Sequence, residues 1–481
     1  MTAIQDMAPT NGLKRTVFLF GASPWNQGVA LRQCAEAGLR VVVAKTISDE
    51  SESNLGAIHR GVQRLPSSSV PHDSEVLPDA VDAISVDLLT RLRRDYGDDW
   101  CTLPLNDYVT EYAAAFSSPL SGTCYPPRSA VIVKRKHELR DMWNNLAARS
   151  GDGLQGVEYC YAEQRNGSDE FDYYPSSGFD ALPEKTAFVI KPDELSASIE
   201  IHSAGSKKEA IDVAHQVCSQ LLSRWSKVGR KIGTEVRPRV VIEAAIERSK
   251  TLHLGAEFSI EFVSCEGRHY PVGVTQKWTG PGFIESAHLF PAESFPARLR
   301  GVLEQAISAL MEQLGVRYGV SHWEFIVTPG ERIALVEGHL RPAGGRIVEL
   351  VQHSTGVSPV AALSDALAQR KANFSFVPRR FCGLFWMVPR VPLAEVSEIK
   401  IEDTAINGLC QDLFVNQAGI KATPNWSRAT DWRRRFAHVI AIGESLESIQ
   451  TCCRDVAHRV VLHGRTDEGP ASTPLMLSID N

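Results

Sequence analysis

The alternation of apolar and polar residues is clearest between Ser321 and Ile347, where it predicts a β-hairpin. The segment Trp323–Val327 has the composition of a strand, and Ile333–Val336 is a second apolar run. Pro329-Gly330 lies between them and is a turn signal. These features predict two neighbouring antiparallel strands.

The hairpin is expected to bring two glutamates together. A four-residue loop, Pro329–Arg332, would pair Phe325 with Val336 and Glu324 with Glu337. Directly opposite side chains share a face, with Cβ atoms roughly 4.5 to 5.5 Å apart, and like charges at that distance repel. Because Mg²⁺ is commonly held by one or two carboxylates together with substrate phosphates, the pair favours a cation site. The alternatives are two solvated glutamates, or a register shifted by one residue that moves one carboxylate to the other face.

The two faces of the first strand differ in polarity. His322 and Glu324 share one face with Ile326, whereas Trp323 and Phe325 lie on the other. The glutamate face is the more polar one, which favours a site over a pair of solvated side chains.

A βαβ unit is predicted near the N-terminus. The strand Thr16–Gly21 is followed by a glycine-bearing turn to Gly28, a helix ending at Gly38 and the strand Leu39–Ala44. The dinucleotide fingerprint GxGxxG is absent, so the turn is evidence for an open α/β domain more than for a cofactor site.

A further buried strand is predicted over Cys101–Leu105, followed by Asn106, Asp107 and a helix over Glu111–Phe116. Polar groups at the carboxyl end of a parallel strand lie where open α/β sheets bind ligands. We therefore expect Asn106 and Asp107 to contact substrate, and the alternative for Asp107 is a helix-capping role.

The remaining chain alternates strands and helices without internal repeats. A basic helix over Lys134–Ser150 leads into a polar loop that ends at about residue 184. Further strands are expected over 188–192, 239–246, 255–264, 270–278, 383–389 and 438–443, and helices over 207–225 and 445–458.

Composition narrows the function classes. The 481 residues suffice for roughly two to four domains. A formal charge of −6 without blocks of basic residues gives no nucleic-acid footprint. No apolar run approaches the ~18 residues of a membrane span, and Asp6 and Asn11 interrupt any signal-peptide core, so a cytoplasmic protein without a membrane partner is expected. The ten cysteines contain no CxxC pair, and reduced thiols are expected.

Three charged residues between the helices and the hairpin are candidate ligand contacts. Lys191 ends the apolar run FVI beside a loop of small residues, and its ammonium suits a phosphate. Glu243 and Glu257 end or begin apolar strands, and either carboxylate could accept hydrogen bonds from an adenine amine or a ribose. Each has the alternative of a solvated residue at a strand end.

The order of these features, from the basic helix to the paired glutamates, resembles the ATP-grasp superfamily of carboxylate-amine ligases. The family pattern around the metal is a Glu on one strand and Glu-x-Asn-x-Arg-x-x-Gly-Gly on the next. This chain has Glu324, then Glu337 thirteen residues later, with His339, Arg341 and Gly344-Gly345 following. The spacing resembles the branch that joins L-amino acids into dipeptides. His339 stands where the family has a metal-binding Asn.

The resemblance implies a nucleotide site. Lys136 and Lys191 would contact the ATP phosphates, Glu257 the ribose, and Glu243 with its neighbours the adenine. The loop after Lys191 has serines in place of the family's glycines. The full implied set of ATP contacts is Lys136, Lys191, Ser196, Ser198, Glu243, Ala245, Ile246, Glu257 and Lys277.

The resemblance also implies a substrate site. The stretch GPGFIESAHLFPA is similar to the family motif Glu-x-Gly-His-x-x-Pro, with Glu285 and His288 in place and Ala287 replacing glycine. The implied substrate contacts are Glu285, His288, Arg341, Gly344, Gly345, Asn106 and Asp107.

In such ligases a carboxylate attacks the γ-phosphate of ATP, and an amine then attacks the resulting acyl phosphate. Mg²⁺, or Mn²⁺, would be held by Glu324, Glu337 and His339. Arg341 would stabilise the oxyanion of the second step, and His288 would orient the first substrate or accept the proton of the amine.

The implied fold is α/β with α+β lobes. It has an open parallel N-terminal domain, a mobile central subdomain that closes as a lid, and a C-terminal antiparallel-sheet domain. The expected division is a flexible tail over 1–14, the N-terminal domain over 15–125, linker helices and a loop over 126–187, the lid over 188–270, the catalytic subdomain over 271–370 and a C-terminal lobe over 371–481.

Three other functions compete with an amino-acid ligase that uses ATP and two amino acids. A related ATP-grasp ligase or carboxylase would act on a different carboxylate. An NAD-dependent oxidoreductase would use the N-terminal βαβ unit, although its fingerprint is missing. A non-catalytic nucleotide-binding module is kept open by His339 and the glycine-poor loop. The oligomeric state is undecided, and a homodimer is allowed.

Overall fold

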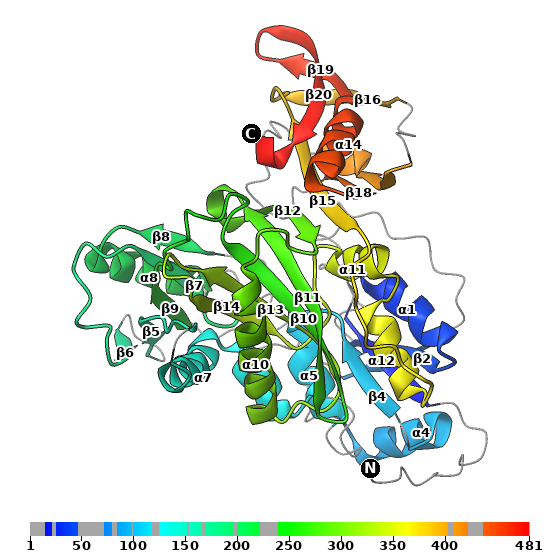
Figure 1. Ribbon diagram of the computed structural model, residues 1–481. Helices are drawn as coiled ribbons and strands as arrows, with labels where there is room; N and C mark the ends of the chain where they lie inside the picture. Colours follow the sequence, from blue (N-terminus) through cyan, green and yellow to red (C-terminus); the bar gives the residue numbers. More distant parts are fainter. Residues whose placement is uncertain are drawn as a thin grey trace.

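The computed structural model describes residues 15–21, 26–46, 72–78, 84–98, 100–117, 125–151, 153–165, 170–195, 200–221, 239–402, 408–421 and 436–480. Three sheets organise this part of the chain. The N-terminal sheet lies beside a long central sheet, the small sheet lies at the opposite flank, and the C-terminal lobe projects from one end (Figure 1).

The N-terminal domain is an open parallel sheet of four strands in the order β3-β2-β1-β4. The predicted βαβ unit is confirmed as β1 (Thr16–Phe20), α1 (Asn26–Glu36) and β2 (Arg40–Thr46). The predicted buried strand is β4 (Trp100–Pro104), which pairs with β1. The sequence did not predict β3 (Asp73–Leu77) or α4 (Val86–Tyr96).

Helices connect this domain to the rest of the molecule. A short 3-10 turn, η2 (Asp107–Val109), leads into α5 (Thr110–Ser117). The predicted basic helix is two helices, α6 (Pro127–Lys134) and α7 (Lys136–Arg149), because Arg135 between them has extended backbone angles of φ −83° and ψ 106°.

The small sheet has five strands in the order β6-β5-β9-β7-β8, with α8 (Lys207–Gln220) packed against it. Its strands are β5 (Tyr159–Gln164), β6 (Phe171–Pro175), β7 (Phe188–Pro192), β8 (His202–Ala204) and β9 (Arg239–Ala244). The expected polar loop before residue 184 therefore contains two strands. The sheet also begins earlier than the expected boundary at residue 188 and ends before the expected boundary at residue 270.

The central sheet has eleven strands and is antiparallel throughout. The strands nearest the hairpin are β10 (Glu257–Cys265), β11 (Arg268–Thr279), β12 (Glu285–Phe290), β13 (Gly319–Val327) and β14 (Ile333–His339). Helix α10 (Ala297–Gln313) precedes the hairpin in the sequence, and α11 (Ile347–Thr355) and α12 (Pro359–Leu367) follow it. A short turn, η5 (Pro281–Phe283), precedes β12.

The C-terminal lobe continues the same sheet through β12 and β15. Two of its strands and its long helix were predicted, namely β15 (Phe381–Pro389), β18 (Ala437–Gly443) and α14 (Leu446–His458). The others were not, namely β16 (Glu395–Ile401), β17 (Cys410–Val415), α13 (Gln417–Lys421), β19 (Val460–Thr466), β20 (Gly469–Leu477) and η7 (Ser478–Asp480).

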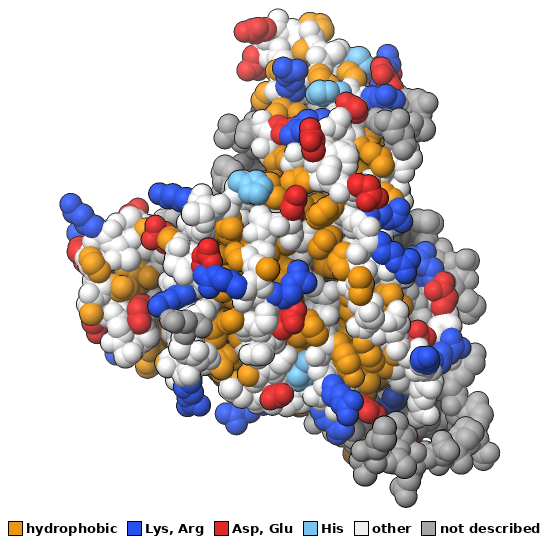
Figure 2. Space-filling model, viewed as in Figure 1, with side chains coloured by type: hydrophobic (Ala, Val, Ile, Leu, Met, Phe, Trp, Pro, Cys, Tyr) orange, Lys and Arg blue, Asp and Glu red, His pale blue; other side chains and the backbone are white. Residues whose placement is uncertain are grey.

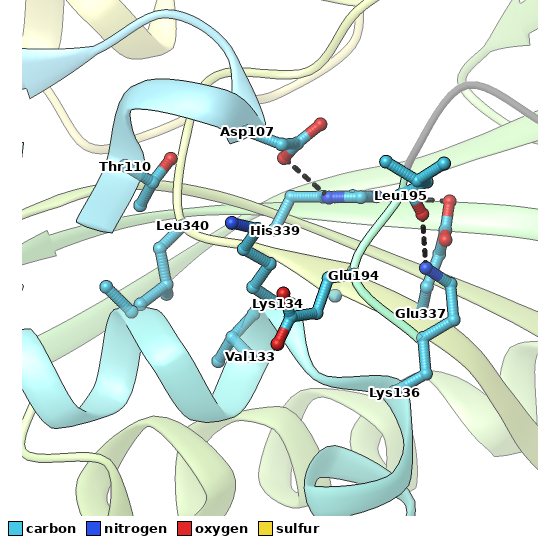
Figure 3. Close-up of a pocket in the computed structure, with 12 residues that line it drawn as sticks. Asp107, Thr110, Val133, Lys134, Lys136, Glu194, Leu195, Glu337, His339 and Leu340 are labelled. Atoms are coloured by element: carbon cyan, nitrogen blue, oxygen red, sulfur yellow. Dashed lines mark hydrogen bonds and ion pairs between the residues drawn. The ribbon is translucent and has the colours of Figure 1, made fainter. Parts of the chain in front are cut away.

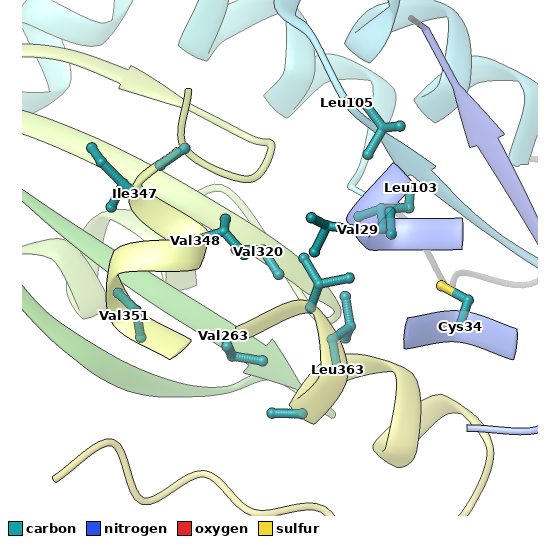
Figure 4. Close-up of a cluster of buried hydrophobic side chains, with 14 of the residues drawn as sticks. Val29, Cys34, Leu103, Leu105, Val263, Val320, Ile347, Val348, Val351 and Leu363 are labelled. Carbon is teal, nitrogen blue, oxygen red and sulfur yellow. The ribbon is translucent and has the colours of Figure 1, made fainter. Parts of the chain in front are cut away.

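A shared hydrophobic core fixes the N-terminal domain against the central sheet. Side chains of α1 and β4, such as Val29 and Leu103, pack with Val263 of β10 and with Val348 and Leu363 of α11 and α12 (Figure 4). Burying each such side chain contributes about 1.5 to 3 kcal/mol. The core therefore holds the carboxyl end of β4, where Asp107 follows, in place relative to the hairpin.

The surface carries charges of both signs. On the face shown in Figure 2, Lys and Arg side chains are interspersed with Asp and Glu. Among the helices described, none is long and apolar enough to cross a membrane. The nine cysteines within the described ranges are all free thiols.

Candidate active site

The hairpin pairs the two glutamates as predicted, but by a different route. Glu324 is the partner of Glu337, whereas Phe325 pairs with Leu335, so the predicted pairing of Phe325 with Val336 is wrong. Val327 pairs with Ile333 next to the turn, and a bulge at Val336 adds one residue to β14. The bulge compensates for the shifted turn and restores the glutamate pair.

The bulge also sets which side chains reach the cavity. Val336 and Glu337 are consecutive, yet both line it, whereas regular strand residues would alternate. Trp323 and Phe325 lie in the hydrophobic core on the other face, as the polarity of the two faces predicted. Gly338 lies against the Trp323 ring, and a Cβ atom there would be 2.5 Å from the indole carbons.

Glu324, Glu337 and His339 form a cluster that can hold a cation. One ligand atom from each lies within 4.8 Å of the others. The Nε2 atom of His339 is 3.1 Å from Glu337, and its Nδ1 atom is 2.8 Å from Asp107. The two carboxylates are hard oxygen donors of the kind that Mg²⁺ and Mn²⁺ prefer, so Glu324 and Glu337 fit the divalent metal that the sequence predicted, whereas the imidazole of His339 is a softer ligand.

The surroundings keep the cluster ionised. Burial by itself raises the pKa of Glu337, but His339, together with the ammonium of Lys136, holds that pKa below its ordinary value. Burial likewise raises the pKa of Glu324, and the neighbouring Lys277 lowers it overall. Burial lowers the pKa of His339, but the Asp107 carboxylate outweighs it and raises that pKa to about 9. Both glutamates are therefore negatively charged near neutral pH.

Lys277 of β11 is the second buried cation at the glutamates. Its ammonium lies 2.6 Å from Glu285 and forms a further ion pair with Glu324. Burial lowers the pKa of Lys277, yet these carboxylates raise it above its ordinary value. The prediction that placed Lys277 among the ATP contacts is not decided by this geometry, but the residue lines the cavity.

A second group of charges lies on the small sheet and α7. The Lys191 ammonium is 2.6 Å from Glu243, whose carboxylate also accepts a 2.8 Å hydrogen bond from Arg140. The Lys136 ammonium donates to the backbone carbonyl of Leu195. Both lysines thus lie next to the start of the loop that follows β7. Ser196 and Ser198 of that loop lie outside the described residues.

Glu257 and Glu243 differ in their surroundings. The Glu257 carboxylate accepts a 2.6 Å hydrogen bond from Thr279 and a 2.8 Å bond from Arg248, and burial raises its pKa. The Glu243 carboxylate is already bound by Arg140 and Lys191. Ala245 and Ile246, which follow Glu243, line the cavity as well.

These residues surround one cavity of about 690 Å³ between the small sheet and the central sheet. Of the residues predicted from the sequence, it is lined by Asp107, Lys191, Glu243, Ala245, Ile246, Glu257, Lys277, Glu285, Glu324, Glu337, His339, Arg341, Gly344 and Gly345. Lys136 lines a small adjoining pocket of about 20 Å³, in which Glu337 and His339 are also found. Figure 3 shows Lys136 at the Leu195 carbonyl, beside Glu337.

The capping role that the sequence left open for Asp107 belongs to Asn106. The Asn106 side chain caps η2 by accepting hydrogen bonds from the backbone of Tyr108 and Val109. Asp107 instead faces the hairpin, where the Arg341 guanidinium donates two 2.8 Å bonds to its two oxygens. Burial raises the pKa of Asp107, but Arg341 and His339 hold it well below its ordinary value.

His288 lies behind the cavity wall. It is fully buried, with Nδ1 3.3 Å from the carbonyl oxygen of Gly345 and Nε2 3.4 Å from Glu285. Gly345 has a φ of +57°, and a Cβ atom there would collide with the His288 ring. Glycine is therefore required at residue 345 for the backbone conformation and for the close approach of the ring.

Sequence reasoning missed a buried polar strip behind the glutamates. His322 is 2.9 Å from Glu324 through Nε2 and 2.7 Å from Glu261 through Nδ1. Glu261 also accepts hydrogen bonds from Ser259 at 2.9 Å and Thr275 at 3.2 Å. The signal was available in the alternation of β10, where the polar residues Glu257, Ser259 and Glu261 recur at every second position between apolar ones.

Comparison with known proteins identifies the architecture. Residues 184–349 match the family model of the ATP-grasp domain. The protein has the ATP-grasp fold. Its model superposes on the crystal structure of an L-amino acid ligase from Bacillus licheniformis with a TM-score of 0.65 and 14% identity, covering 95% of this chain and 100% of that one. The predicted fold class and the resemblance to ATP-grasp proteins are confirmed.

Other known proteins resemble a short stretch of this sequence or share its fold. A stretch of 109 residues is 29% identical to the alanine–anticapsin ligase of Bacillus amyloliquefaciens, and it covers 23% of each protein. The phosphoribosylglycinamide synthetase of Anaerococcus prevotii superposes with a TM-score of 0.61 and 11% identity, covering 94% of this chain and 100% of that one. The biotin carboxylase domain of the Hydrogenobacter thermophilus 2-oxoglutarate carboxylase was crystallised with MgADP and bicarbonate. It superposes with a TM-score of 0.59 and 10% identity, covering 97% of this chain and 92% of that one.

Proposed function

We propose that this ATP-grasp protein is an ADP-forming ligase that joins the carboxylate of one amino acid to the amine of another. The observation that carries the proposal is the convergence of Glu324, Glu337 and His339 with Lys191 around one cavity, with Lys136 in the pocket that adjoins it. Facing carboxylates hold a divalent cation, and ammonium groups opposite them hold phosphates, as phosphoryl transfer requires. The structural likeness to an L-amino acid ligase and the local identity to a ligase that acts on alanine support the choice of substrate class.

Each group of residues has a role in this proposal. Glu324, Glu337 and His339 would hold Mg²⁺, which neutralises charge on the β- and γ-phosphates when bound. Lys136 and Lys191 would hold the phosphates from the other side. Lys191 must then exchange part of its contact with Glu243 for a phosphate oxygen.

The nucleotide would lie between the two sheets. Ala245 and Ile246 line the cavity at the end of β9, and we propose that they contact the adenine together with the backbone of Glu243. Glu257 lines the cavity from β10 of the central sheet and would accept hydrogen bonds from the ribose. The small sheet, which carries Lys191, would close over the cavity as a lid and keep water from the acyl phosphate.

The substrate side is formed by β12, η2 and the loop after β14. The carboxylate oxygen of the first amino acid attacks the γ-phosphorus, the bond to the bridging oxygen breaks, and ADP leaves. The amine of the second amino acid then attacks the acyl carbon, and inorganic phosphate leaves. Arg341 and the backbone of Gly344 and Gly345 would stabilise the oxyanion that forms when the amine attacks and disappears when phosphate leaves. Glu285 and the buried His288 would orient the amino acids.

A carboxylase or another ATP-grasp ligase is the second candidate. The specific observation in its favour is that the bicarbonate-bound carboxylase domain superposes almost as well as the L-amino acid ligase. The two reactions share the nucleotide and metal groups and differ in the carboxylate that is activated.

The test is a turnover assay with ATP, Mg²⁺ and pools of amino acids, followed by mass spectrometry of the products. We expect ADP and phosphate in equal amounts only when suitable amino acids are present, and a dipeptide mass among the products. Activation by bicarbonate alone would favour the carboxylase. AMP formation, or no turnover across a broad panel of amino acids, would refute the proposed ligase.

A pair of matched variants tests the metal assignment. Glu337→Gln removes one carboxylate of the cluster and should abolish turnover while leaving the circular dichroism spectrum unchanged. Glu293→Gln alters an exposed glutamate on the loop after β12 and should leave turnover intact. Equal activity in both variants would contradict the assignment of Glu337 to the metal.

A further inference from the structure

Arg140 lies at the contact between the metal hairpin and the nucleotide-binding sheet. It belongs to α7, and it is only 2% exposed. Its guanidinium donates to Glu243 Oε1 through Nη2 at 2.8 Å and through Nε at 3.1 Å. The same group donates through Nη1 to the backbone carbonyl of Leu335 and through Nη2 to that of Val336, the latter at 3.3 Å. The buried Arg140 thus donates hydrogen bonds to two separate strands, β9 and β14.

The two carbonyls are those of the β14 bulge. A bulge leaves one residue out of the strand ladder, and its backbone groups need other partners when they are buried. Val336 is that residue, because Leu335 pairs with Phe325 and Glu337 pairs with Glu324. Arg140 supplies the missing donors, so the extra residue of the bulge is stabilised from outside the sheet.

The position of Glu337 depends on this bulge. Counting regularly from the pair Val327–Ile333 would set Val336 opposite Glu324 and turn Glu337 toward the hydrophobic core. The bulge instead directs the Glu337 carboxylate into the cavity beside Glu324. An arginine that holds the bulge therefore also holds the geometry of the glutamate pair.

The guanidinium of Arg140 also binds Glu243 of the small sheet. Glu243 is 2% exposed and accepts from both Arg140 and Lys191. Arg140 thereby fixes the carboxylate against which the Lys191 ammonium rests. Arg140 thus acts on two walls of the cavity. It binds the backbone next to Glu337 on one side, and the carboxylate that holds Lys191 on the other.

We propose that Arg140 is a positioning residue that fixes the β14 bulge and so aims Glu337 at the divalent cation, while it aligns Lys191 through Glu243. The inference rests on the proposed function, since it takes Glu337 as a metal ligand. A lysine cannot replace the planar fork, because a single ammonium cannot reach the Glu243 carboxylate and both carbonyls with the same geometry.

The experiment measures Mn²⁺ affinity by electron paramagnetic resonance in the presence of a non-hydrolysable ATP analogue. Arg140→Lys should weaken Mn²⁺ binding by about 10- to 100-fold, the range found when groups that orient metal ligands are replaced. The matched control is Arg239→Lys, which changes a buried arginine of β9 in the small sheet that pairs with Glu163 at 2.8 Å. Its Mn²⁺ affinity should stay within about twofold of the natural protein.

A double variant separates positioning from simple charge balance. Arg140→Met/Glu243→Gln removes one positive and one negative charge together, so the net buried charge is unchanged, and the glutamine amide oxygen remains as an acceptor for the Lys191 ammonium. If Arg140 fixes the bulge, Mn²⁺ binding stays weak in this double variant. Recovery of the natural affinity would overturn the inference, and so would natural affinity in Arg140→Lys.

A third variant keeps this inference distinct from the proposed function. Glu337→Gln should lose Mn²⁺ binding altogether. If the natural protein binds no Mn²⁺ with the nucleotide analogue, or if Glu337→Gln binds it normally, the proposed metal site is wrong and the inference about Arg140 falls with it. If Glu337→Gln loses binding while Arg140→Lys keeps it, the inference about Arg140 alone is wrong.

Discussion

Replacing Glu261 by leucine tests whether the polar strip behind the glutamates stabilises the central sheet. Glu261 is completely buried on β10 and accepts hydrogen bonds from Ser259, Thr275 and His322 at 2.9, 3.2 and 2.7 Å. Leucine is similar in size but accepts no hydrogen bond. The substitution would leave two hydroxyls and an imidazole nitrogen without their acceptor in the interior of the sheet.

The expected cost follows from the kind of bond lost. Each hydroxyl bond contributes about 1 kcal/mol, and the bond from a ring nitrogen to a carboxylate contributes about 1.5 to 3 kcal/mol. Relief of the buried charge offsets part of the loss, but removal of one partner from a buried pair typically costs about 3 to 5 kcal/mol. We expect Glu261→Leu to lower the free energy of unfolding by about 3 to 4 kcal/mol.

Urea unfolding followed by tryptophan fluorescence measures this change, because Trp323 of the neighbouring strand pairs with Ile260, the residue next to Glu261. Glu293→Leu, on an exposed loop, is the control and should change the free energy by less than about 0.5 kcal/mol. The double variant Glu261→Leu/His322→Phe should lose at least about 1 kcal/mol less than the two single variants together. A loss below about 1 kcal/mol in Glu261→Leu, or strict additivity in the double variant, would refute the reasoning.

Three further changes have definite expected outcomes. Asp107→Asn weakens the two charge-assisted bonds from Arg341 and should lower kcat/KM by about 10- to 100-fold in a phosphate-release assay, and an unchanged value would mean that the pair is only structural. Gly338→Ala places a methyl group 2.5 Å from the Trp323 ring and should cost about 1 to 3 kcal/mol of stability in thermal unfolding, whereas an unchanged melting temperature would contradict the close contact. Burial holds the pKa of His438 well below its ordinary value of 6.5, so the imidazole is neutral in the fold and only the unfolded chain binds its proton. Stability should therefore fall as the pH drops below 6.5, and His438→Phe should make unfolding curves measured between pH 7 and 5 less pH-dependent.

The glutamate pair shows how far sequence reasoning reached at the site. Counting outward from an assumed four-residue loop predicted that Glu324 and Glu337 lie opposite each other, and the polarity of the two strand faces favoured a site there. The exact register was not predictable, because a bulge leaves no mark in the alternation of a strand as short as Ile333–Val336. The pairing was correct because the loop length was misjudged by one residue and the bulge added one residue back.

The missed elements share a physical cause. The strands β5 and β6 lie in a segment rich in polar residues, and β6 is an edge strand with the exposed side chains Tyr173 and Tyr174. The edge strand β6 has no buried residue, so its local pattern is weak. The β16–β19–β20 ladder of the C-terminal lobe alternates charged and apolar residues in short runs, and pairing between distant segments decides its structure.

Arg140 shows a limit of a different kind. In the sequence it is one of several charged residues in a basic helix, where a solvated position is the normal expectation. Its burial depends on α7 packing between the hairpin and β9, which are distant in the chain. By contrast, Asp107 could be predicted, because the carboxyl end of a parallel strand points to a ligand site in any open α/β sheet.

The seam between β12 and β15 limits how the protein can be divided. His288 of β12 pairs with Leu384 of β15, and Ala287 pairs with Phe385, so the strand that carries the substrate-side residues has the C-terminal lobe as its neighbour. A chain that ended at residue 370 would leave β12 as an unpaired edge strand. Ala287 and Leu289 would also lose the hydrophobic side chains of the C-terminal lobe against which they pack. The segment before residue 370 is therefore not a transferable module, and domain exchange with proteins of the same fold should succeed only when the C-terminal lobe moves together with it.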